Sequence, residues 1–254
     1  MNTISQAWIL GQRALREVLR TPEATFPTLF IPLFFLVVNV GQAGNVFPSE
    51  TTPFLRGQSY AAFQLPSSIL LAASFGSAAL YLVEDIEGGY FDKLRAAPIS
   101  RTAIVLGRLF AEAAKGVLIT LVMVLIALPF GVHIESGALG LLLIVVIASA
   151  WGVVFSAAMQ LIALKSRSAA ATQSGSMVFF PLLFLTPNFV PRETLTRPME
   201  IAATINPVTY VMEALRSLIL DGFDWSRIGV GFAVVGVCAV LAIGANVAMI
   251  RSYD

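Results

Sequence analysis

The sequence predicts an all-α integral membrane protein with six transmembrane helices, and two observations support this fold class. The chain of 254 residues is 57% hydrophobic and only 12% charged, and its mean hydropathy is +0.83, more apolar than a water-soluble core of this length requires. Six apolar runs have about the length that a helix needs to cross the hydrocarbon layer, namely 25–41, 61–83, 103–131, 138–164, 173–190 and 228–250. We expect them to form one membrane domain over residues 1–254.

The distribution of Lys and Arg predicts that both termini face the cytoplasm. With the N-terminus inside, ten basic residues fall on the cytoplasmic side, namely Arg13, Arg16, Arg20, Lys93, Arg95, Arg101, Arg108, Lys165, Arg167 and Arg251. Five fall outside, namely Arg56, Arg192, Arg197, Arg216 and Arg227, and Lys115 lies within the third helix. The net charge of +1 gives no basic face for nucleic acid.

Residues 1–24 have the pattern of an amphipathic helix that lies in the membrane plane. Arg13, Arg16 and Arg20 share one face, and Trp8 and Leu15 lie toward the other. Tryptophan and arginine are suited to the headgroup level. Pro22 is expected to end this helix and turn the chain into the bilayer.

The first span is rich in phenylalanine and proline, and the second in small residues. The third is longer than a crossing needs, and its first turns carry Arg108, Glu112 and Lys115 at helical spacing. We expect these turns to lie in the cytoplasm or the interface, with the three side chains pairing with one another.

Residues 84–101, between the second and third spans, predict a short cytoplasmic helix that starts after Gly88-Gly89. Its apolar side carries Tyr90, Phe91, Leu94 and Ala97, and its charged side carries Asp92, Lys93 and Arg95. Pro98 cannot continue the helix, and Ser100 can cap the third span. An ordinary solvated loop is the alternative.

Residues 191–227, between the fifth and sixth spans, predict a helical segment that enters the outer leaflet and returns. Asn206 suits an N-cap, Pro207 the first helical position and Gly222 the C-terminal stop. An apolar stripe follows the helical period, namely Val208, Val211, Met212, Leu215, Leu218 and Ile219. Thr209, Glu213 and Arg216 lie opposite, and protein must cover such re-entrant backbone.

Chemistry for catalysis is absent from the sequence. No Gly-rich loop ending in Lys-Ser/Thr is present to bind ATP, and the spans hold no Ser/His or Asp/Asp pair for an intramembrane enzyme. We interpret His133 as a surface histidine. Cys238 is the single cysteine of the sequence, so a metal site with several thiolate ligands is excluded. Four polar residues within the spans, Asn39, Gln64, Gln160 and Asn246, are expected to form interhelical hydrogen bonds rather than an ion pathway.

Phenylalanines and prolines cluster in the first and fifth spans. We take Phe30, Phe34, Phe180 and Phe184 as candidates for the wall of a path for an amphiphile. Lipid-facing phenylalanine is the alternative for each of them.

Two motifs resemble the ABC-2 family of ABC exporter permeases, most closely its daunorubicin/doxorubicin-resistance-like branch. Glu87-x-Gly89, Leu94 and Pro98-x-Ser100-Arg101 match the pattern E-x-G-T-L-x-x-L-x-x-x-P-x-S-R, with Tyr90 and Phe91 where Thr and Leu are usual. The stretch FFPLLFLTPNFVP and the later NPVTY and ALR are similar in spacing to the C-terminal signature of that branch.

The resemblance implies a coupling helix that rests on a separate ABC ATPase subunit. Its residues would be Glu87, Gly89, Tyr90, Phe91, Leu94, Arg95, Pro98 and Arg101, with a second contact through Arg13, Arg16 and Arg20. Asn206, Pro207, Tyr210 and Arg216 would belong to an external gate segment. Two permease copies, identical or related, would pair with two ATPase subunits in a bacterial plasma membrane. ATP and Mg²⁺ would bind the partner, with no cofactor in this chain.

The function that this resemblance implies is outward export of an amphipathic or hydrophobic molecule, either a drug-like natural product or a lipid. A polysaccharide or glycolipid exporter is the alternative within the family, although such a channel would favour more Trp and Tyr in the spans. An intramembrane enzyme or an ion pathway ranks lower, because the spans lack the catalytic pairs and the carboxylate rings that these need.

The topology can be tested by cysteine labelling. The Ser166→Cys variant should react with a membrane-impermeant maleimide only from the cytoplasmic side, and Thr194→Cys only from outside, because these positions flank spans of opposite direction. The reverse pattern would contradict the predicted orientation.

Overall fold

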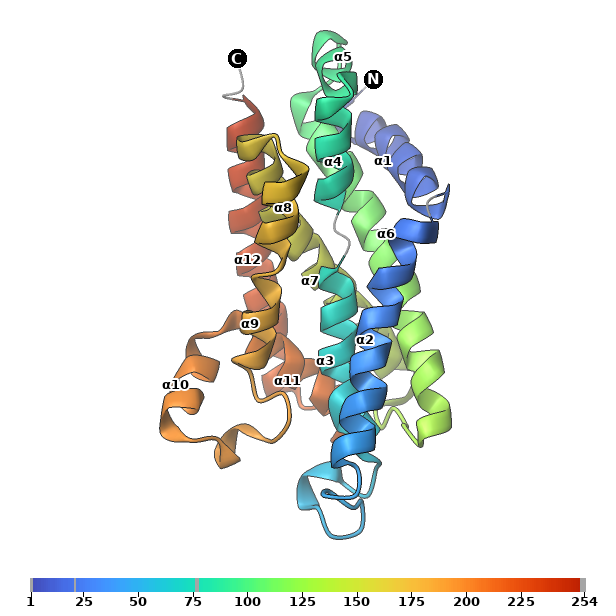
Figure 1. Cartoon of the computed structure of the whole chain (residues 1–254), viewed down its shortest axis with the longest axis vertical. Coiled ribbons are helices and arrows are strands. Elements are labelled where there is room, and N and C mark those ends of the chain that lie inside the picture. The colour runs from blue at the N-terminus through green and yellow to red at the C-terminus, as the bar shows by residue number, and fades with distance from the viewer. Residues whose placement is uncertain (1, 21, 76–77, 252–254) are drawn as a thin grey trace.

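The computed structural model describes residues 2–20, 22–75 and 78–251, and these residues form α-helices and short 3₁₀ turns without a β-strand. Figure 1 shows an elongated bundle with both termini and α5 (Tyr90–Ala96) at one end. The loop 44–59, α10 (Arg197–Ile205) and α11 (Pro207–Leu220) lie at the opposite end. We call these the terminal end and the far end. The all-helical fold class is confirmed for the described residues.

Five segments of the described chain are long and apolar enough to cross a membrane. They are Phe26–Ala43 in α2 (Pro22–Ala43), Tyr60–Glu87, Thr102–Phe130 beginning in α6 (Arg101–Ala127), α7 (Gly137–Ser166) and Trp225–Ile250 in α12 (Trp225–Arg251). They coincide with the predicted spans one, two, three, four and six.

The second span is interrupted, which the sequence analysis did not predict. It consists of α3 (Tyr60–Ser74) and α4 (Ala78–Glu87), and Phe75 already has the extended backbone angles φ −84° and ψ 149°. Serine and glycine near the break have lower helix propensity than leucine or alanine. Every residue of α3 is buried, so α3 is the central helix of the far half of the bundle.

The predicted fifth span, 173–190, does not form one long helix. The chain instead forms α8 (Ala169–Ser176) and α9 (Phe179–Phe184), which is followed by a loop. At about 1.5 Å per residue, the stretch 169–184 extends roughly 24 Å, less than the ~30 Å hydrocarbon layer. Pro187, three residues beyond α9, cannot supply the backbone N–H that a continuing helix would need.

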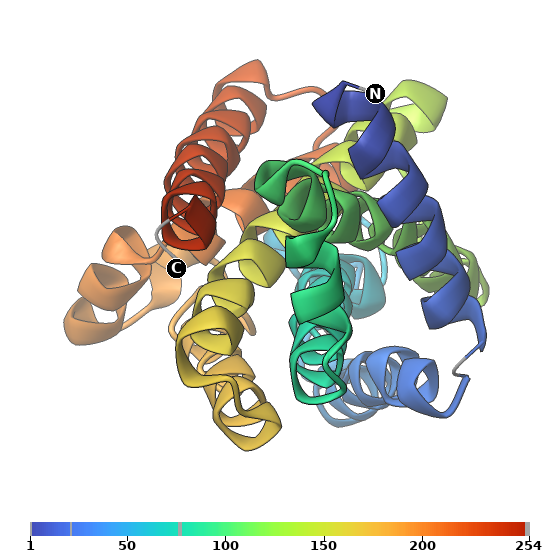
Figure 2. The ribbon, with the colours of Figure 1, turned by 90° about the horizontal axis from the view of Figure 1, so that it is seen from above.

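The N-terminal amphipathic helix is α1 (Thr3–Arg20), and it lies along one side of the terminal end (Figure 2). It packs mainly against α6, where Gly11 and Gly107 face each other. A Cβ atom added at Gly107 would come 2.7 Å from Leu10 Cβ, so the two backbones approach closely only because both positions are glycine. The position of α1 in the membrane plane stays a prediction.

The segment predicted to be re-entrant contains α11, whose predicted start and end are confirmed. Asn206 is the N-cap, its side chain accepts a 3.0 Å hydrogen bond from Val208 N, and Gly222 follows the helix with φ +86°. The predicted polar face is wrong, however, because Thr209 and Arg216 are both buried. The reason is that α11 packs against α3, α7 and α12 at once, so its polar side is enclosed as well.

The predicted interhelical hydrogen bonds of the spans are confirmed at three of four positions. Asn246 Nδ2 donates to the carbonyl of Ala157 over 2.6 Å, and Asn39 Nδ2 donates to Gln64 Oε1 over 3.4 Å. Gln160 is fully buried, but its amide has no hydrogen-bond partner among the described residues. The prediction is therefore wrong for Gln160.

The enclosure of α11 predicts that Thr209→Asp and Leu215→Asp are equally damaging. Each variant buries a carboxylate in a packed helix, which should lower the free energy of unfolding by roughly 3 kcal/mol or more. Thr196→Asp is the control, since Thr196 is the exposed N-cap of α10, where Asp is favoured. The measurement is thermal unfolding in detergent, and a stable Thr209→Asp protein would contradict the enclosure.

Candidate functional site

A buried ionic cluster joins α4 to α1 and α6 at the terminal end. Asp85 of α4 forms an ion pair with Arg108 of α6, and Arg13 of α1 lies 3.2 Å from its second oxygen. Asp85 and Arg108 are both buried. Charges out of water are stable only when they are paired and hydrogen-bonded, so this pairing fixes α4 against its two neighbours.

A second buried pair lies one to two turns along α6. Glu112 and Lys115 form an ion pair at i, i+3 spacing, and Lys115 Nζ also donates a 3.3 Å hydrogen bond to the carbonyl oxygen of Phe75. Phe75 is the residue where α3 ends, and its carbonyl has lost the helical partner that an uninterrupted span would supply. Lys115 therefore stabilises the break in the second span. The sequence predicted pairing among Arg108, Glu112 and Lys115, but not their contacts with α4 and Phe75.

The short helix predicted after Gly88-Gly89 is confirmed as α5. Gly89 precedes it with φ +70°, a left-handed conformation that favours glycine. Phe91 is buried, Leu94 is half-buried, and Arg13 Cζ lies 4.0 Å from the centre of the Tyr90 ring. The exposed residues on and around α5 include Glu87, Asp92, Lys93 and Pro98.

The three N-terminal arginines expected to contact a partner differ in their exposure to solvent. Arg16 and Arg20 are exposed, whereas Arg13 is turned toward Asp85 and Tyr90. The side chains of Arg95 and Arg101 lie outside the residues that the structure describes. Ser100 stands at the N-cap of α6 as predicted, but its side chain makes no capping bond, and its backbone N donates to Gln6 Oε1 over 2.8 Å.

A narrow apolar groove of about 10 Å³, with polar groups at its edges, lies between α2, α3 and α9. Its lining residues come from these helices and the loop after α9, namely Phe35, Asn39, Ser67, Ser68, Leu71, Phe180, Leu183, Phe184 and Asn188. Gln64 Nε2 donates to the carbonyl of Asn188 over 3.0 Å, so α3 holds the loop after α9 beside the groove.

Two of the four candidate pathway phenylalanines line this groove. Phe180 and Phe184 contact Phe35, with ring centroids 6.3 and 6.4 Å away. Phe30 and Phe34 are instead exposed on the outside of α2. The sequence analysis did not select Phe35, Asn39 or the serine pair as pathway residues, although Phe35 and Asn39 lie four residues apart on one helix face.

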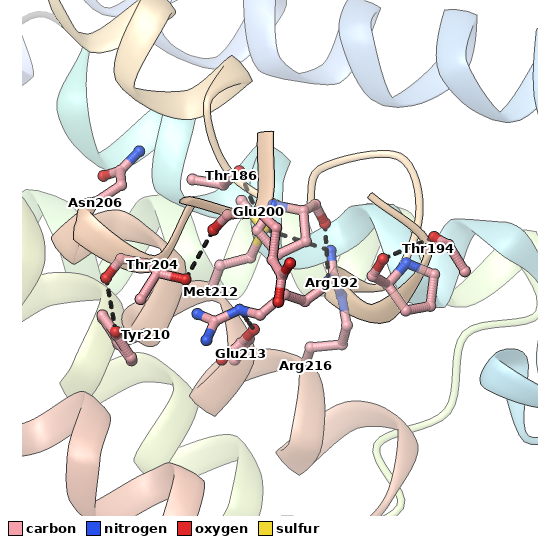
Figure 3. A network of polar contacts seen from close by, with 12 residues as sticks. Thr186, Arg192, Thr194, Glu200, Thr204, Asn206, Tyr210, Met212, Glu213 and Arg216 are labelled. Atoms are coloured by element: carbon pink, nitrogen blue, oxygen red, sulfur yellow. Dashed lines mark hydrogen bonds and ion pairs between the residues drawn. The ribbon is translucent and has the colours of Figure 1, made fainter. Parts of the chain in front are cut away.

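The predicted external gate residues lie along α11 and at its N-cap, at the far end, and three of them bond different neighbours (Figure 3). Asn206 Nδ2 donates to the carbonyl of Leu182, which links α11 to α9, and the Tyr210 hydroxyl donates to the carbonyl of Thr204 over 2.7 Å. Arg216 donates to the carbonyls of Phe63 and Pro187. These bonds hold α9, α10 and α11 together with α3.

Burial changes the ionisation of two residues in this segment. Desolvation lowers the pKa of Arg216 to about 10, with the charge of Glu213 acting in the opposite direction. Desolvation likewise raises the pKa of Glu213 above its ordinary value, against the effect of Arg192. No cluster of three His, Cys, Asp or Glu residues that could hold a metal ion occurs in the described ranges.

Comparisons with known proteins agree with this architecture. The family described as ABC-2 type transporter matches residues 5–220. The chain is 25% identical over 249 residues to a daunorubicin resistance ABC transporter permease protein, DrrB1, of Streptomyces coeruleorubidus, covering 94% of this chain and 83% of the relative. It is also 22% identical over 243 residues to a probable doxorubicin resistance ABC transporter permease protein, DrrC, of Mycobacterium tuberculosis, covering 94% and 86%.

The ionic cluster predicts a large cost for losing one carboxylate. Asp85→Asn should lower the free energy of unfolding by about 3 kcal/mol or more, because the buried Arg108 loses the carboxylate it pairs with. Glu50→Gln, the same loss of charge at an exposed position of the loop 44–59, should alter it by less than about 0.5 kcal/mol. Equal thermal unfolding of the two variants in detergent would show that the cluster is dispensable.

Proposed function

This chain belongs to the ABC-2 type transporter family, and on that premise we propose that it is the membrane-spanning permease subunit of an ATP-driven exporter. The observation that carries the proposal is α5, a short helix at the terminal end that buries Phe91 and exposes Asp92 and Lys93, with the exposed Glu87 at the end of α4 just before it. Such a helix offers a charged surface to a partner, while its apolar side stays fixed to the bundle.

The partner in this proposal is a separate ATPase subunit that binds ATP and Mg²⁺. The terminal end would then face the cytoplasm, and α5 with Arg16 and Arg20 would form the docking surface. Two ATPase subunits and two permease chains, identical or related, would complete the exporter in a bacterial plasma membrane. The chain itself would bind no cofactor and would perform no bond chemistry.

Movement would pass from α5 to the bundle through α4. Because Asp85 pairs with Arg108 and Arg13, a push on α5 acts on α4, α6 and α1 together. The second span is divided at Phe75, so α4 can tilt while α3 stays packed in the far half. In this proposal the permease has two conformations, which differ in the tilt of α4. Export requires that these two conformations differ in their contacts with the ATPase and with the substrate.

The proposed substrate path follows the groove between α2, α3 and α9, which has to widen from its volume of about 10 Å³ to admit a substrate. Phenylalanine rings beside Asn39 and Ser67 suit a molecule with both apolar and polar parts, such as a drug-like natural product or a lipid. Two relatives are named for resistance to daunorubicin and doxorubicin, which supports a drug-like substrate. A polysaccharide or glycolipid exporter remains the second candidate by family alone.

The proposal predicts a functional defect without a defect in assembly. Glu87→Gln removes an exposed charge at the end of α4, and Gly89→Ala strains a left-handed position by about 1 kcal/mol. Each variant should lower substrate-stimulated ATP hydrolysis of the purified complex several-fold, while the amount of permease in the membrane stays unchanged.

Glu135→Gln provides the matched control, because Glu135 is exposed and lies in the loop between α6 and α7, away from α5. The wild-type chain should first be purified from its native membranes together with a P-loop subunit. Recovery of the chain alone in mild detergent, or ATP hydrolysis in the Glu87→Gln complex equal to that of the control, would contradict the proposal.

A further inference from the structure

A polar cavity of about 300 Å³ lies at the far end, outside the proposed substrate groove and away from α5. Its walls come from the loop before α3, the 3₁₀ turn Arg192–Thr194, α11 and the first turn of α12. Four arginines line it, namely Arg56, Arg192, Arg216 and Arg227. A volume of this size is at the lower end of the range for small-molecule sites.

Arg216 places a buried positive charge in the wall of this cavity. Its side chain is only 7% exposed, and its guanidinium lies 3.6 Å from the centre of the Phe63 ring. Its hydrogen bonds go to two backbone carbonyls and to Met212 Sδ, and no carboxylate of the described chain lies within ion-pair distance. The charge is thus solvated by dipoles and an aromatic face without being neutralised by contact.

Arg192 brings donors that lack acceptors to the same cavity (Figure 3). Its Nε is 3.2 Å from Glu213 Oε1, yet the geometry makes no hydrogen bond, and its buried Nε and Nη2 have no acceptor within the described residues. The Tyr210 ring lies 5.2 Å from Arg192 Cζ and limits the positions of the guanidinium. Buried donors without partners are costly, so an additional acceptor at this position would stabilise the segment.

The arginines that line the cavity differ in how closely carboxylates approach them. The four arginines face three lining carboxylates, Glu193, Glu213 and Asp221, and Arg227 Nε also lies 3.2 Å from Asp224 Oδ2. Asp221 is shared, because Arg56 Nε lies 2.8 Å from one of its oxygens and Arg227 Nη1 lies 3.5 Å from the other. Arg216 is the one of the four that has no carboxylate within ion-pair distance among the described residues.

We propose that this cavity is a binding site for a phosphate group at the far end of the protein. Arginine guanidinium groups bind phosphate oxygens through paired, charge-assisted hydrogen bonds, and the unsatisfied Nη2 of Arg192 and the uncompensated charge of Arg216 suit such a ligand. The phosphate can belong to a lipid headgroup or to a free anion. The proposal is independent of the exporter function, because binding is a property of the isolated chain.

The test uses the full chain purified in a nonionic detergent and follows the midpoint of thermal unfolding by tryptophan fluorescence. Ligands that bind only the folded state raise this midpoint in a saturable way. One arm titrates inorganic phosphate at constant ionic strength, and the other titrates dihexanoylphosphatidylglycerol below its micelle concentration. Dihexanoylglycerol, which has the same acyl chains but no phosphate, serves as the control ligand.

Arg192→Gln should raise the apparent Kd about tenfold or more, which corresponds to the loss of one charge-assisted hydrogen bond. Arg197→Gln is the matched control, since Arg197 pairs with Glu200 on the surface of α10 and does not line the cavity. Arg56→Gln gives a second cavity variant at an exposed side chain, in case Arg192→Gln does not fold.

Saturable stabilisation by inorganic phosphate would support a site for a soluble anion, and stabilisation by the phosphatidylglycerol alone would support a lipid headgroup site. In either case, the Arg192→Gln or Arg56→Gln variant must bind the ligand more weakly than the wild-type chain. The Arg197→Gln variant must bind it with wild-type affinity. No saturable shift with either ligand, or equal shifts in all variants, would overturn the proposal. Failure of ATPase coupling would leave this result unaffected.

Discussion

The rest of the structure depends on how the break in the second span is stabilised. The carbonyl of Phe75, freed at this break, needs a hydrogen-bond donor from the protein, and Lys115 is that donor. Inside a bilayer no water can satisfy a backbone group that leaves a helix, so a span can be broken only where protein supplies a partner. Lys115 of α6 is the hydrogen-bond donor to the carbonyl of Phe75, and Glu112 forms an ion pair with the ammonium group of Lys115. The cluster around Asp85 then holds the freed α4 to α6 and α1. The buried charged residues therefore stabilise both the break in the second span and the position of α4 after it.

The same constraint shapes the far half of the bundle. The helix α3 is buried throughout, and it bonds the loop after α9 through Gln64 and Tyr60. Arg216 of α11 bonds the carbonyls of Phe63 and Pro187, and Asn206 bonds that of Leu182. The chain after α9 contains a loop before the next helix, and its carbonyls at Leu182 and Pro187 accept hydrogen bonds from side chains of α11 and its N-cap.

Elements with local signals could be predicted from the sequence, and long-range contacts could not. The start of α5 after Gly89 and the cap of α11 at Asn206 depend on residues adjacent in the chain, and both are confirmed. The break at Phe75 depends on Lys115, forty residues later, and periodicity contains no information on that pairing. The burial of Thr209 is equally non-local, because a helical period reveals an apolar face but not how many neighbours enclose a helix. Phe35 was missed in the groove for the same reason.

The contact between Gly11 and Gly107 has a consequence for the biosynthesis of the protein. The helix α1 is synthesised first, but the surface it packs against becomes available only after α2, α3, α4 and α5 have been made and α6 has followed. Until then its apolar side chains, including Trp8, need another environment, and the surface of the bilayer provides one for an amphipathic helix. When α6 inserts, α1 can replace its contacts with lipid by contacts with α6. Insertion of α6 is thus the step that completes the packing of the terminal end.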